Sequence, residues 1–337
     1  MSATATVQAS TMKAIVQDRY GSADVLELKE IDRPAVGNGD VLVKVHAAAA
    51  HQGDWHLMTG RPYLVRIMGF GLRRPKTTVR GMDVAGRVEA VGTSVTQFQP
   101  GDEVFGWCNG SFAEYACAPV SNFLPKPARL TFEQAAAVPI SGMTALQAVR
   151  DTGQVRAGQK VLITGAAGGV GSFAVQIAKA FGAEVTGVCS TTKADLVRSI
   201  GADHVIDYTR EDFTRGGQRY DVIVDTAGRR PLRHLRRALG PAGMLVLVGG
   251  EGGDRWLGGF DRQLRAVLLS PFVRQHLRML VSVERQEDLA VLKEMIEARM
   301  VTPVIDRRYP LSETPEAIRY LAQGHAIGKT VINVSGR

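Results

Sequence analysis

The sequence predicts an α/β fold in which a doubly wound parallel sheet is inserted into a β-rich domain. In the first third of the 337 residues, short alternating or β-branched runs are separated by Gly and Pro clusters, which is typical of strands and turns. From about Thr131 to residue 298, apolar runs of strand length alternate with segments of helical period. This alternation predicts a parallel sheet covered on both faces. We therefore expect residues 1–137 and 302–337 to form the β-rich domain and residues 138–301 to form the α/β domain.

The β-rich part is predicted from local patterns. Residues 98–102 read Phe-Gln-Pro-Gly-Asp, which is turn chemistry between two strands. After the α/β part, the chain end is expected to form strands at residues 303–310 and 330–334, with a helix at residues 315–323 between them. The strands expected in the first third lie at residues 13–17, 25–30, 40–47, 84–91, around 104, at 111–119 and at 122–125.

Two helices are expected around the boundary between the β-rich part and the α/β part. Thr131 is followed three residues later by Gln134, a capping-box pattern that predicts a helix with Thr131 as its N-cap. A second helix is expected at residues 143–152. Strands are then expected at residues 161–164, 184–188, 204–206, 221–225 and 244–248, with 281–283 as a candidate sixth, and helices at residues 169–181, 193–200, 232–239 and 286–298.

Composition indicates a folded protein without a membrane span. Apolar residues make up 45% of the chain, and no apolar run approaches the roughly 18–20 residues that cross a bilayer. The three cysteines form no Cys-x-x-Cys pair, so we expect free thiols in a reducing compartment. Residues 1–13 lack a signal pattern and are expected to fray, which makes a cytoplasmic location the default expectation.

The formal net charge of +8 indicates affinity for anions. The basic residues are not interleaved with aromatics, and no nucleic-acid-binding module is recognisable, so nucleic acid is an unlikely partner. An arginine cluster falls at the helix expected at residues 232–239, and we interpret it as a solvated basic helix face. Its members are Arg229, Arg230, Arg233, Arg236 and Arg237.

The strongest local motif is a glycine turn between a strand and a helix. The strand Val-Leu-Ile-Thr at residues 161–164 leads into Gly-Ala-Ala-Gly-Gly-Val-Gly at residues 165–171, and an amphipathic helix follows. Glycines let the backbone approach a pyrophosphate, and the helix N-terminus supplies N–H groups and a positive dipole end. We therefore predict a Rossmann-type dinucleotide site that includes Ala167, Gly168, Gly169 and Val170. The alternative is an ordinary glycine-rich turn that binds nothing.

The end of the next strand favours NADPH over NADH. An NAD enzyme needs an acid there for the ribose 2′-hydroxyl, but residues 188–193 read Val-Cys-Ser-Thr-Thr-Lys. The hydroxyl of Ser190 and the ammonium of Lys193 suit a 2′-phosphate instead. Arg198, on the following helix, is a further candidate for binding the 2′-phosphate. The carboxylate of Asp195 argues against NADPH. Lys193 could also be a solvated lysine in the first turn of a helix.

Four stretches together resemble the medium-chain dehydrogenase/reductase superfamily, in its zinc-independent quinone oxidoreductase branch. They are Arg-Gly-Met-Asp-Val-Ala-Gly at residues 80–86, Phe-x-Pro-Gly-Asp-x-Val at 98–104, the glycine turn, and Gly-Ala-Asp-His-Val-Ile-Asp-Tyr at 201–208. The resemblance covers nearly the whole chain. It implies a GroES-like β-rich domain formed by both ends of the chain around a Rossmann domain, and it makes a homodimer the best expectation.

The resemblance also implies roles for individual residues. Ser190, Lys193 and Tyr208 would bind the adenosine 2′-phosphate. Thr144, in the segment Ser-Gly-Met-Thr at residues 141–144, would approach the nicotinamide. Ala227 and Gly249 follow strands at the carboxyl edge of the sheet, where ligands of open α/β folds bind.

Zinc-dependent relatives place a cysteine ligand where this chain has His51 and a histidine ligand where it has Met82. A thioether does not suit zinc, and the lobe between residues 104 and 119 lacks the four cysteines of a structural zinc site. His51, Asp54 and His56 could form a different metal site, but their crowding in one loop makes poor zinc geometry. We therefore expect no metal.

The loop at residues 50–56 is the expected substrate pocket. His56 and His51 are candidate proton donors, and Asp54 is a third candidate with a structural alternative, because a buried Asp often fixes a loop through backbone N–H groups. Trp55 and Tyr63 could wall the pocket or pack the domain. Residues 63–76 are a candidate lid, and residues 264–280 are a candidate cover or dimer contact.

These features favour an NADPH-dependent reductase of quinones or α,β-unsaturated carbonyls. Without a Lewis acid, a conjugated acceptor is easier to reduce than a simple ketone because its developing charge is delocalised. Two alternatives remain. One is an alcohol dehydrogenase or carbonyl reductase of the same fold, and the other is a non-catalytic NADPH-binding protein that acts as a scaffold, a redox sensor or a nucleic-acid binder.

Overall fold

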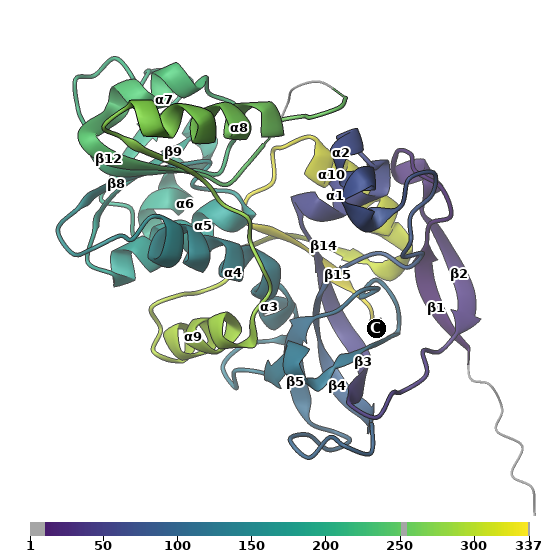
Figure 1. Cartoon of the computed structure of the whole chain (residues 1–337). Coiled ribbons are helices and arrows are strands. Elements are labelled where there is room, and N and C mark those ends of the chain that lie inside the picture. The colour runs from purple at the N-terminus through teal and green to yellow at the C-terminus, as the bar shows by residue number, and fades with distance from the viewer. Residues whose placement is uncertain (1–10, 251–254, 336–337) are drawn as a thin grey trace, which may run out of the picture.

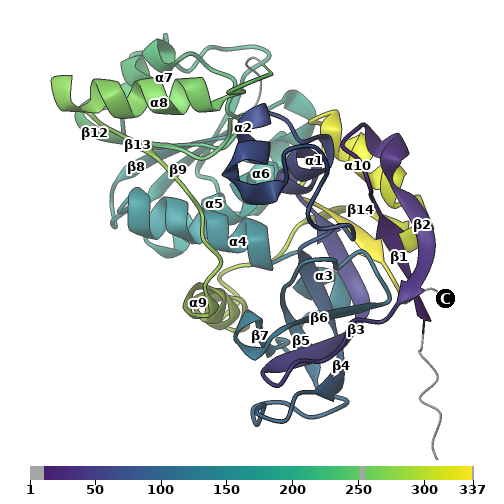
Figure 2. The same ribbon diagram turned by 45° about the vertical axis from the view of Figure 1, so that its right-hand side comes forward.

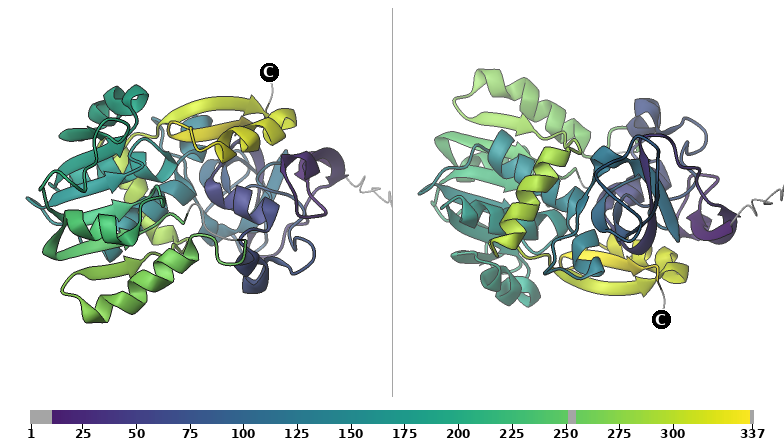
Figure 3. Two further views of the ribbon diagram at one scale, coloured as in Figure 1. Left: turned by 90° about the horizontal axis from the view of Figure 1, so that it is seen from above. Right: turned by 90° about the horizontal axis from the view of Figure 1, so that it is seen from below.

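The computed structural model describes residues 11–250 and 255–335, which form a β-rich domain and an α/β domain side by side (Figures 1 and 3). Residues 1–10 of the expected frayed start lie outside the described residues, whereas residues 11–13 were predicted wrongly, because they begin strand β1 (Thr11–Val16). Within the described residues, no helix is both long and apolar enough to cross a membrane. The described cysteines are free thiols, as expected.

The α/β domain contains a six-stranded parallel sheet in the order β10-β9-β8-β11-β12-β13. The strand order reverses between β8 and β11, and this switch point is where doubly wound sheets bind ligands. The strands are β8 (Lys160–Thr164), β9 (Glu184–Cys189), β10 (His204–Asp207), β11 (Tyr220–Asp225), β12 (Leu239–Leu247) and β13 (His276–Met279).

Helices cover both faces of this sheet, because its central strands are apolar on both sides. In β8, Val161 and Ile163 pack into the core that includes α5, whereas Leu162 packs with residues of α7 and α8 on the opposite face. Figure 2 shows α7 and α8 on one side of the sheet and α4 and α5 on the other. The helices are α4 (Pro139–Leu146), α5 (Gly169–Ala180), α6 (Ala194–Ser199), α7 (Leu232–Ala238), α8 (Phe260–Leu269) and α9 (Gln286–Glu297).

The β-rich domain is built from both ends of the described chain. Its main sheet runs β14-β15-β3-β4-β5-β7, with β6 also paired to β3, and β1 (Thr11–Val16) pairs antiparallel with β2 (Glu27–Asp32). Because β15 pairs with β3, the C-terminal strand completes the sheet that the N-terminal part begins. The strands are β3 (Asp40–Ala50), β4 (Asp83–Val91), β5 (Glu103–Trp107), β6 (Tyr115–Pro119), β7 (Phe123–Pro125), β14 (Ile305–Pro310) and β15 (Lys329–Asn333).

The helices of this domain include the predicted capping box. The main-chain N–H of Gln134 donates to Thr131 Oγ1 at 3.2 Å, and the Thr131 N–H donates to Gln134 Oε1 at 3.1 Å. This confirms Thr131 as the N-cap of α3. The helices are α1 (Gln52–Thr59), α2 (Tyr63–Val65), α3 (Phe132–Ala136) and α10 (Thr314–Ala322).

Several details differ from the sequence prediction. The sixth strand is β13, not residues 281–283, because the edge of β12 pairs with residues 276–279. The second helix begins at Pro139, a residue favoured at the first helical position. Helix α8 was not predicted, although its sequence is amphipathic; in the structure Gln263 is buried while Leu264 and Leu268 are exposed. The domain boundaries at 137/138 and 301/302 stay predictions.

Candidate active site

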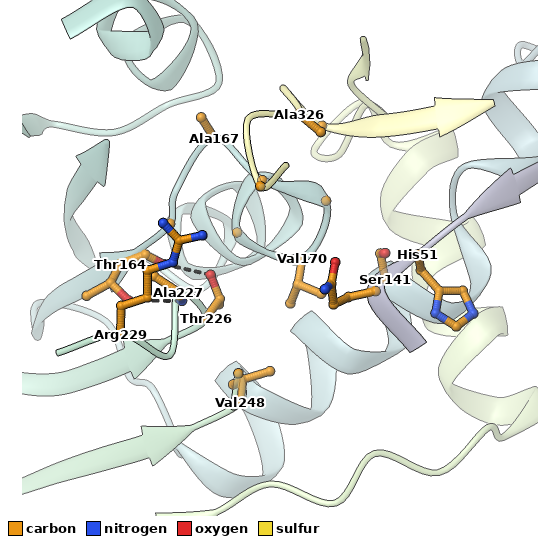
Figure 4. A pocket seen from close by; sticks show the side chains of 18 of the residues that line it. His51, Ser141, Thr164, Ala167, Val170, Thr226, Ala227, Arg229, Val248 and Ala326 are labelled. Carbon is orange, nitrogen blue, oxygen red and sulfur yellow. Dashed lines mark hydrogen bonds between the residues drawn. The ribbon is translucent and has the colours of Figure 1, made fainter. Parts of the chain in front are cut away.

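A cleft of about 590 Å³ is lined by residues of both domains, a volume within the range of small-molecule sites. The α/β domain contributes the turn after β8 and the ends of β9, β11 and β12. The β-rich domain contributes α1 and residues 321–329. Figure 4 shows Arg229 and Thr164 at one side of this cleft and His51 and Ser141 at the other, with Val170 of α5 between them.

The glycine turn presents the uncapped N-terminus of α5 to the cleft. Gly168 is the N-cap residue, and it has no side chain to occupy the first N–H groups of the helix, so these are available to an anion. Gly171 allows the tight turn, since a Cβ there would lie 2.1 Å from the Gly165 carbonyl oxygen. Ala166, which replaces the first motif glycine, is buried and donates its N–H to the Val188 carbonyl at 3.1 Å.

A buried network fixes the carboxyl ends of the central strands. Asp225 at the end of β11 accepts a 2.5 Å hydrogen bond from Thr164 Oγ1 and pairs with Arg262 of α8 at 2.6 Å. Arg262 also donates to the Gly249 carbonyl at 3.0 Å. The fully buried carboxylate is thus paired and hydrogen-bonded, which a buried charge requires. The network therefore connects the ends of β8 and β11 and the residue Gly249 after β12 to helix α8, beneath the cleft.

The predicted adenosine-binding residues Ser190, Lys193 and Tyr208 all line the cleft. Lys193 Nζ donates to the carbonyls of His325 and Ala326 at 2.8 and 3.1 Å, so it connects the end of β9 to the segment before β15. Burial lowers the pKa of the Lys193 ammonium, partly offset by the charge of Asp306.

Two members of the arginine cluster, which was interpreted as a solvated helix face, do not lie on the helix. Arg229 and Arg230 precede α7 and line the cleft. A Cβ on Gly324 would lie 2.7 Å from Arg229 Nη2, so this guanidinium lies against the same segment that Lys193 holds. Their position directly after a strand end, at the carboxyl edge of the sheet, was the available sequence signal.

Arg198 and Asp195 are not among the residues that line the cleft. They pair with each other at 2.9 Å on the exposed surface of α6. The one carboxylate that argued against NADPH therefore lies away from the cleft lining.

At the other end of the cleft lie Thr144, His51 and His56. The residues expected to form a loop here instead form α1, because the Asp54 carboxylate accepts the His51 main-chain N–H at 2.9 Å and secures the first turn. His56 Nδ1 lies 2.8 Å from the Arg61 carbonyl oxygen. Since a carbonyl only accepts, Nδ1 carries a proton in this contact.

Three predicted residues lie outside the cleft lining. Asp54 is 2% exposed, and burial raises the pKa of its carboxyl group, which matches the structural alternative. Trp55 packs against an apolar core of the β-rich domain. Tyr63 makes an edge contact with Trp256 at 5.2 Å and, with Arg66, helps line a separate cavity of about 260 Å³.

The residues present do not fit zinc. Among the residues that the structure describes, no group of three or more His, Cys, Asp or Glu side chains is placed to hold a metal ion. His51 and Met82 occupy the positions of two zinc ligands in zinc-dependent relatives, and a thioether is a poor zinc ligand. For a dinucleotide the residues do fit, because the uncapped α5 N-terminus lies between a cationic end and a histidine-bearing end of one cleft.

Two family models match the chain. The one described as an alcohol dehydrogenase GroES-like domain matches residues 37–128, and the one described as a zinc-binding dehydrogenase matches residues 200–332.

Relatives match along nearly the whole chain. The Mus musculus protein named NAD(P)H oxidoreductase RTN4IP1, mitochondrial, is 33% identical, and the match covers 98% of this chain and 91% of that protein. Quinone-oxidoreductase QR1, chloroplastic, of Triphysaria versicolor is 32% identical over 95% of this chain and 98% of that protein. The 2-methylene-furan-3-one reductase of Solanum lycopersicum is 34% identical over 96% of this chain and 79% of that protein.

Solved structures of related proteins also match this chain over nearly its whole length. The quinone oxidoreductase from Coxiella burnetii superimposes with a TM-score of 0.85 and 29% identity, over 96% of this chain and all of that chain. A mycobacterial protein, Rv1454c, solved in complex with NADPH, gives a TM-score of 0.80 and 26% identity with the same coverage. The chain therefore belongs to the medium-chain dehydrogenase/reductase superfamily, in its quinone oxidoreductase-like branch of nicotinamide-dependent oxidoreductases.

Proposed function

We propose that this protein is an NADPH-dependent, zinc-independent reductase that transfers a hydride to a quinone or an α,β-unsaturated carbonyl compound. The observation that carries the proposal is the single cleft that joins the uncapped α5 N-terminus and the cations Lys193 and Arg229 to His51 and His56. Relatives named as quinone oxidoreductases and as a 2-methylene-furan-3-one reductase, and a neighbour solved with NADPH, support it.

The chain's own residues would bind and orient the cofactor. The N–H groups at the start of α5 bind the diphosphate. Ser190, Lys193 and Tyr208 line the cleft and would bind the 2′-phosphate, and Thr144, which also lines it, would approach the nicotinamide. When bound, NADPH supplies the hydride. Ala227 and Gly249, at the ends of β11 and β12, leave the backbone accessible along the cleft.

Hydride addition to the β-carbon of an enone, or to a quinone, leaves negative charge on an oxygen that must then gain a proton. His56 is the proposed donor: while its Nδ1 proton is held on the Arg61 carbonyl, the protonated imidazolium would give up its proton from Nε2. His51 lines the same end of the cleft. Asp54 acts through His51 by fixing the first turn of α1, rather than on the substrate.

The test compares NADPH and NADH oxidation after exhaustive chelator treatment. The acceptors are a naphthoquinone, a phenanthrenequinone, an acyclic enone and a simple aldehyde, and the signal is the absorbance of the reduced nicotinamide. Chelator-resistant quinone or enone turnover that prefers NADPH is expected. Turnover confined to the aldehyde and abolished by the chelator would instead support the alcohol dehydrogenase or carbonyl reductase alternative. NADPH binding without turnover of any acceptor would support a non-catalytic regulatory role.

Two further parts of the proposal concern assembly and location. We propose a homodimer, since β13 ends the parallel sheet and the nearby Phe272 is 85% exposed. The cytoplasmic location expected from the sequence stays a prediction, because the names of the relatives include both mitochondrial and chloroplastic proteins. Subcellular fractionation with an antibody to the native protein tests it.

A further inference from the structure

A fully buried ion pair lies at the cleft and has no place in the mechanism above. Lys329, the first residue of β15, places its Nζ 2.8 Å from Oδ2 of Asp83, the first residue of β4. The two residues are 246 positions apart. Lys329 is 2% exposed and Asp83 is fully buried, yet Lys329 is one of the residues that line the cleft.

Both charged groups are held by further hydrogen bonds. The other carboxylate oxygen of Asp83 accepts the Ile140 main-chain N–H at 2.7 Å, at the start of α4. Lys329 Nζ also donates to Ser141 Oγ at 3.1 Å. Ser141 lies in the first turn of α4, and Thr144 lies one turn later on the same helix. The pair therefore fixes the helix that presents Thr144 to the nicotinamide end of the cleft.

The pair also adjoins the glycine turn. A Cβ on Gly169 would lie 3.3 Å from Lys329 Cδ and 3.4 Å from Ser141 Oγ. The neighbouring Gly328 donates its N–H to the Ala167 carbonyl at 2.7 Å. Lys329 thus lies where the glycine turn, the proposed cofactor-binding segment, contacts the β-rich domain.

Stability alone does not account for such a pair. Taking two charges out of water costs several kcal/mol per ion, and apolar replacements of buried pairs are often neutral or stabilising. Hydride transfer, in contrast, is sensitive to placement: a misplacement of about 1 Å can cost about 100-fold in rate.

We propose that Asp83, Lys329 and Ser141 form a positioning unit that sets the nicotinamide end of the cleft relative to the acceptor. Asp83 holds the Lys329 ammonium in place, and Lys329 fixes Ser141 and hence the face of α4 that carries Thr144. This inference rests on the proposed reductase function and concerns the rate of hydride transfer rather than the adenosine end of the site.

The test compares four variants with the wild-type protein: Lys329→Met, Asp83→Asn, the double variant with both changes, and Ser141→Ala. The single charge changes leave a buried charge without its partner, which is strongly destabilising. The double variant removes both charges at similar volume and should regain most of the melting temperature. Readouts are the melting temperature, NADPH affinity by fluorescence titration, kcat and KM, and the isotope effect with NADPH deuterated at C4.

The matched control is the ion pair of Arg150 and Asp288. Asp288 is buried, the pair distance is 2.5 Å, and neither residue lines the cleft. The double variant Arg150→Met with Asp288→Asn therefore removes an ion pair that does not line the cleft, although Arg150 is partly exposed and also pairs with Asp151. It should leave kcat within about twofold of the wild type.

If the unit positions the nicotinamide, the Lys329→Met, Asp83→Asn double variant melts near the wild type and binds NADPH within about threefold. Its kcat falls about 10- to 100-fold, and its isotope effect rises. Ser141→Ala shows a smaller loss of kcat with an unchanged melting temperature.

Wild-type kcat in a folded double variant would overturn the inference and leave the pair a structural one. If the double variant does not fold, the Ser141→Ala variant provides the test. An unchanged kcat and an unchanged isotope effect in Ser141→Ala would then overturn the inference. Failure of the proposed function is distinguishable, because the wild-type protein itself would then turn over neither quinone nor enone.

Discussion

At the scale of single residues, Lys193 combines an observed structural role with its proposed role in binding the 2′-phosphate. Its ammonium donates to two carbonyls of the segment before β15, and an ammonium has three N–H groups. One donor is therefore left for a ligand beside Ser190 and Tyr208, which line the same end of the cleft. Because both carbonyls are neutral, the positive charge itself remains available to a 2′-phosphate.

Replacing Lys193 by Met should weaken NADPH selectively. A hydrogen bond to a charged group contributes about 1.5–3 kcal/mol, so KM for NADPH should rise about 10- to 100-fold while KM for NADH stays within about twofold. Steady-state kinetics with both cofactors measure this. Arg198→Met, which changes an exposed cation paired with Asp195, is the control and should change neither value. Equal losses for both cofactors would show that Lys193 acts only through the segment that it holds.

The lowered pKa of Lys193 predicts a pH dependence. The ammonium must be protonated to attract a 2′-phosphate, so NADPH affinity should fall as pH rises through the Lys193 pKa, which lies below the ordinary value of about 10.4. Below about pH 6 the phosphate itself gains a proton and affinity falls again. Lys193→Arg keeps the charge and should lose the alkaline decline. Fluorescence titration of NADPH and NADH across pH checks this, and a parallel alkaline decline for NADH would contradict it.

At the scale of elements, the junction of β8 and α5 depends on backbone approach. Gly165 has a φ of 64°, which favours glycine, and Gly171 lies against the Gly165 carbonyl. The helix N-terminus can face a phosphate only if this turn stays closed.

Gly171→Ala should therefore disrupt the cofactor site. The added Cβ would lie 2.1 Å from the Gly165 oxygen, so the turn must shift. We expect NADPH affinity to fall at least 10-fold, about 1.4 kcal/mol or more, together with a lower melting temperature. Gly168→Ala is the milder control, because its nearest contact is 3.3 Å, again to the Gly165 oxygen. Isothermal titration calorimetry with NADPH measures the affinity of both variants. Equal affinities of Gly171→Ala and Gly168→Ala would rule out this steric explanation.

Helix α1 was predicted to be a loop, because the sequence signal at its N-terminal end is weak. His51 is not a residue favoured at the N-cap, and the capping box that closes the first turn includes the Asp54 carboxylate, which accepts the His51 N–H. The helix ends at Gly60, which takes the left-handed conformation, with φ 59° and ψ 33°, that commonly terminates a helix. The histidines are therefore presented from a helix, which positions them more firmly than a loop.

At the scale of the whole molecule, the exposed end of the parallel sheet predicts the assembly. Within residues 11–250 and 255–335, strand β13 has a sheet neighbour on one side only, and Phe272, Val281 and Leu268 nearby are 85, 65 and 63% exposed. An edge strand with exposed apolar neighbours is a site for pairing with another chain.

We expect a homodimer through this edge. Phe272→Asp places a charge in the interface and should shift the protein toward monomer, whereas Phe70→Asp, an exposed aromatic of the β-rich domain, should not. Light scattering after size exclusion, repeated over a range of concentrations, measures the mass. A monomeric wild-type protein, or a Phe272→Asp dimer of unchanged stability, would contradict the proposed interface.

The sequence by itself determined the features that depend on neighbouring residues. The Thr131 capping box, the glycine turn and the strand–helix alternation follow from local backbone preference and apolar period, and all are present. Apart from the further candidate Arg198, the positions predicted to bind the cofactor line the cleft, because the ends of parallel strands meet at one edge.

Only the tertiary structure decided which distant groups meet. It brought Lys329 to Asp83, Arg229 to the Gly324 segment, and Lys193 to the carbonyls before β15. It also placed Asp54, Trp55 and Tyr63 outside the cleft lining, although their neighbours His51 and His56 line it. No spacing in the sequence records these contacts, because they depend on how the sheets pair and how the two domains close around one cleft.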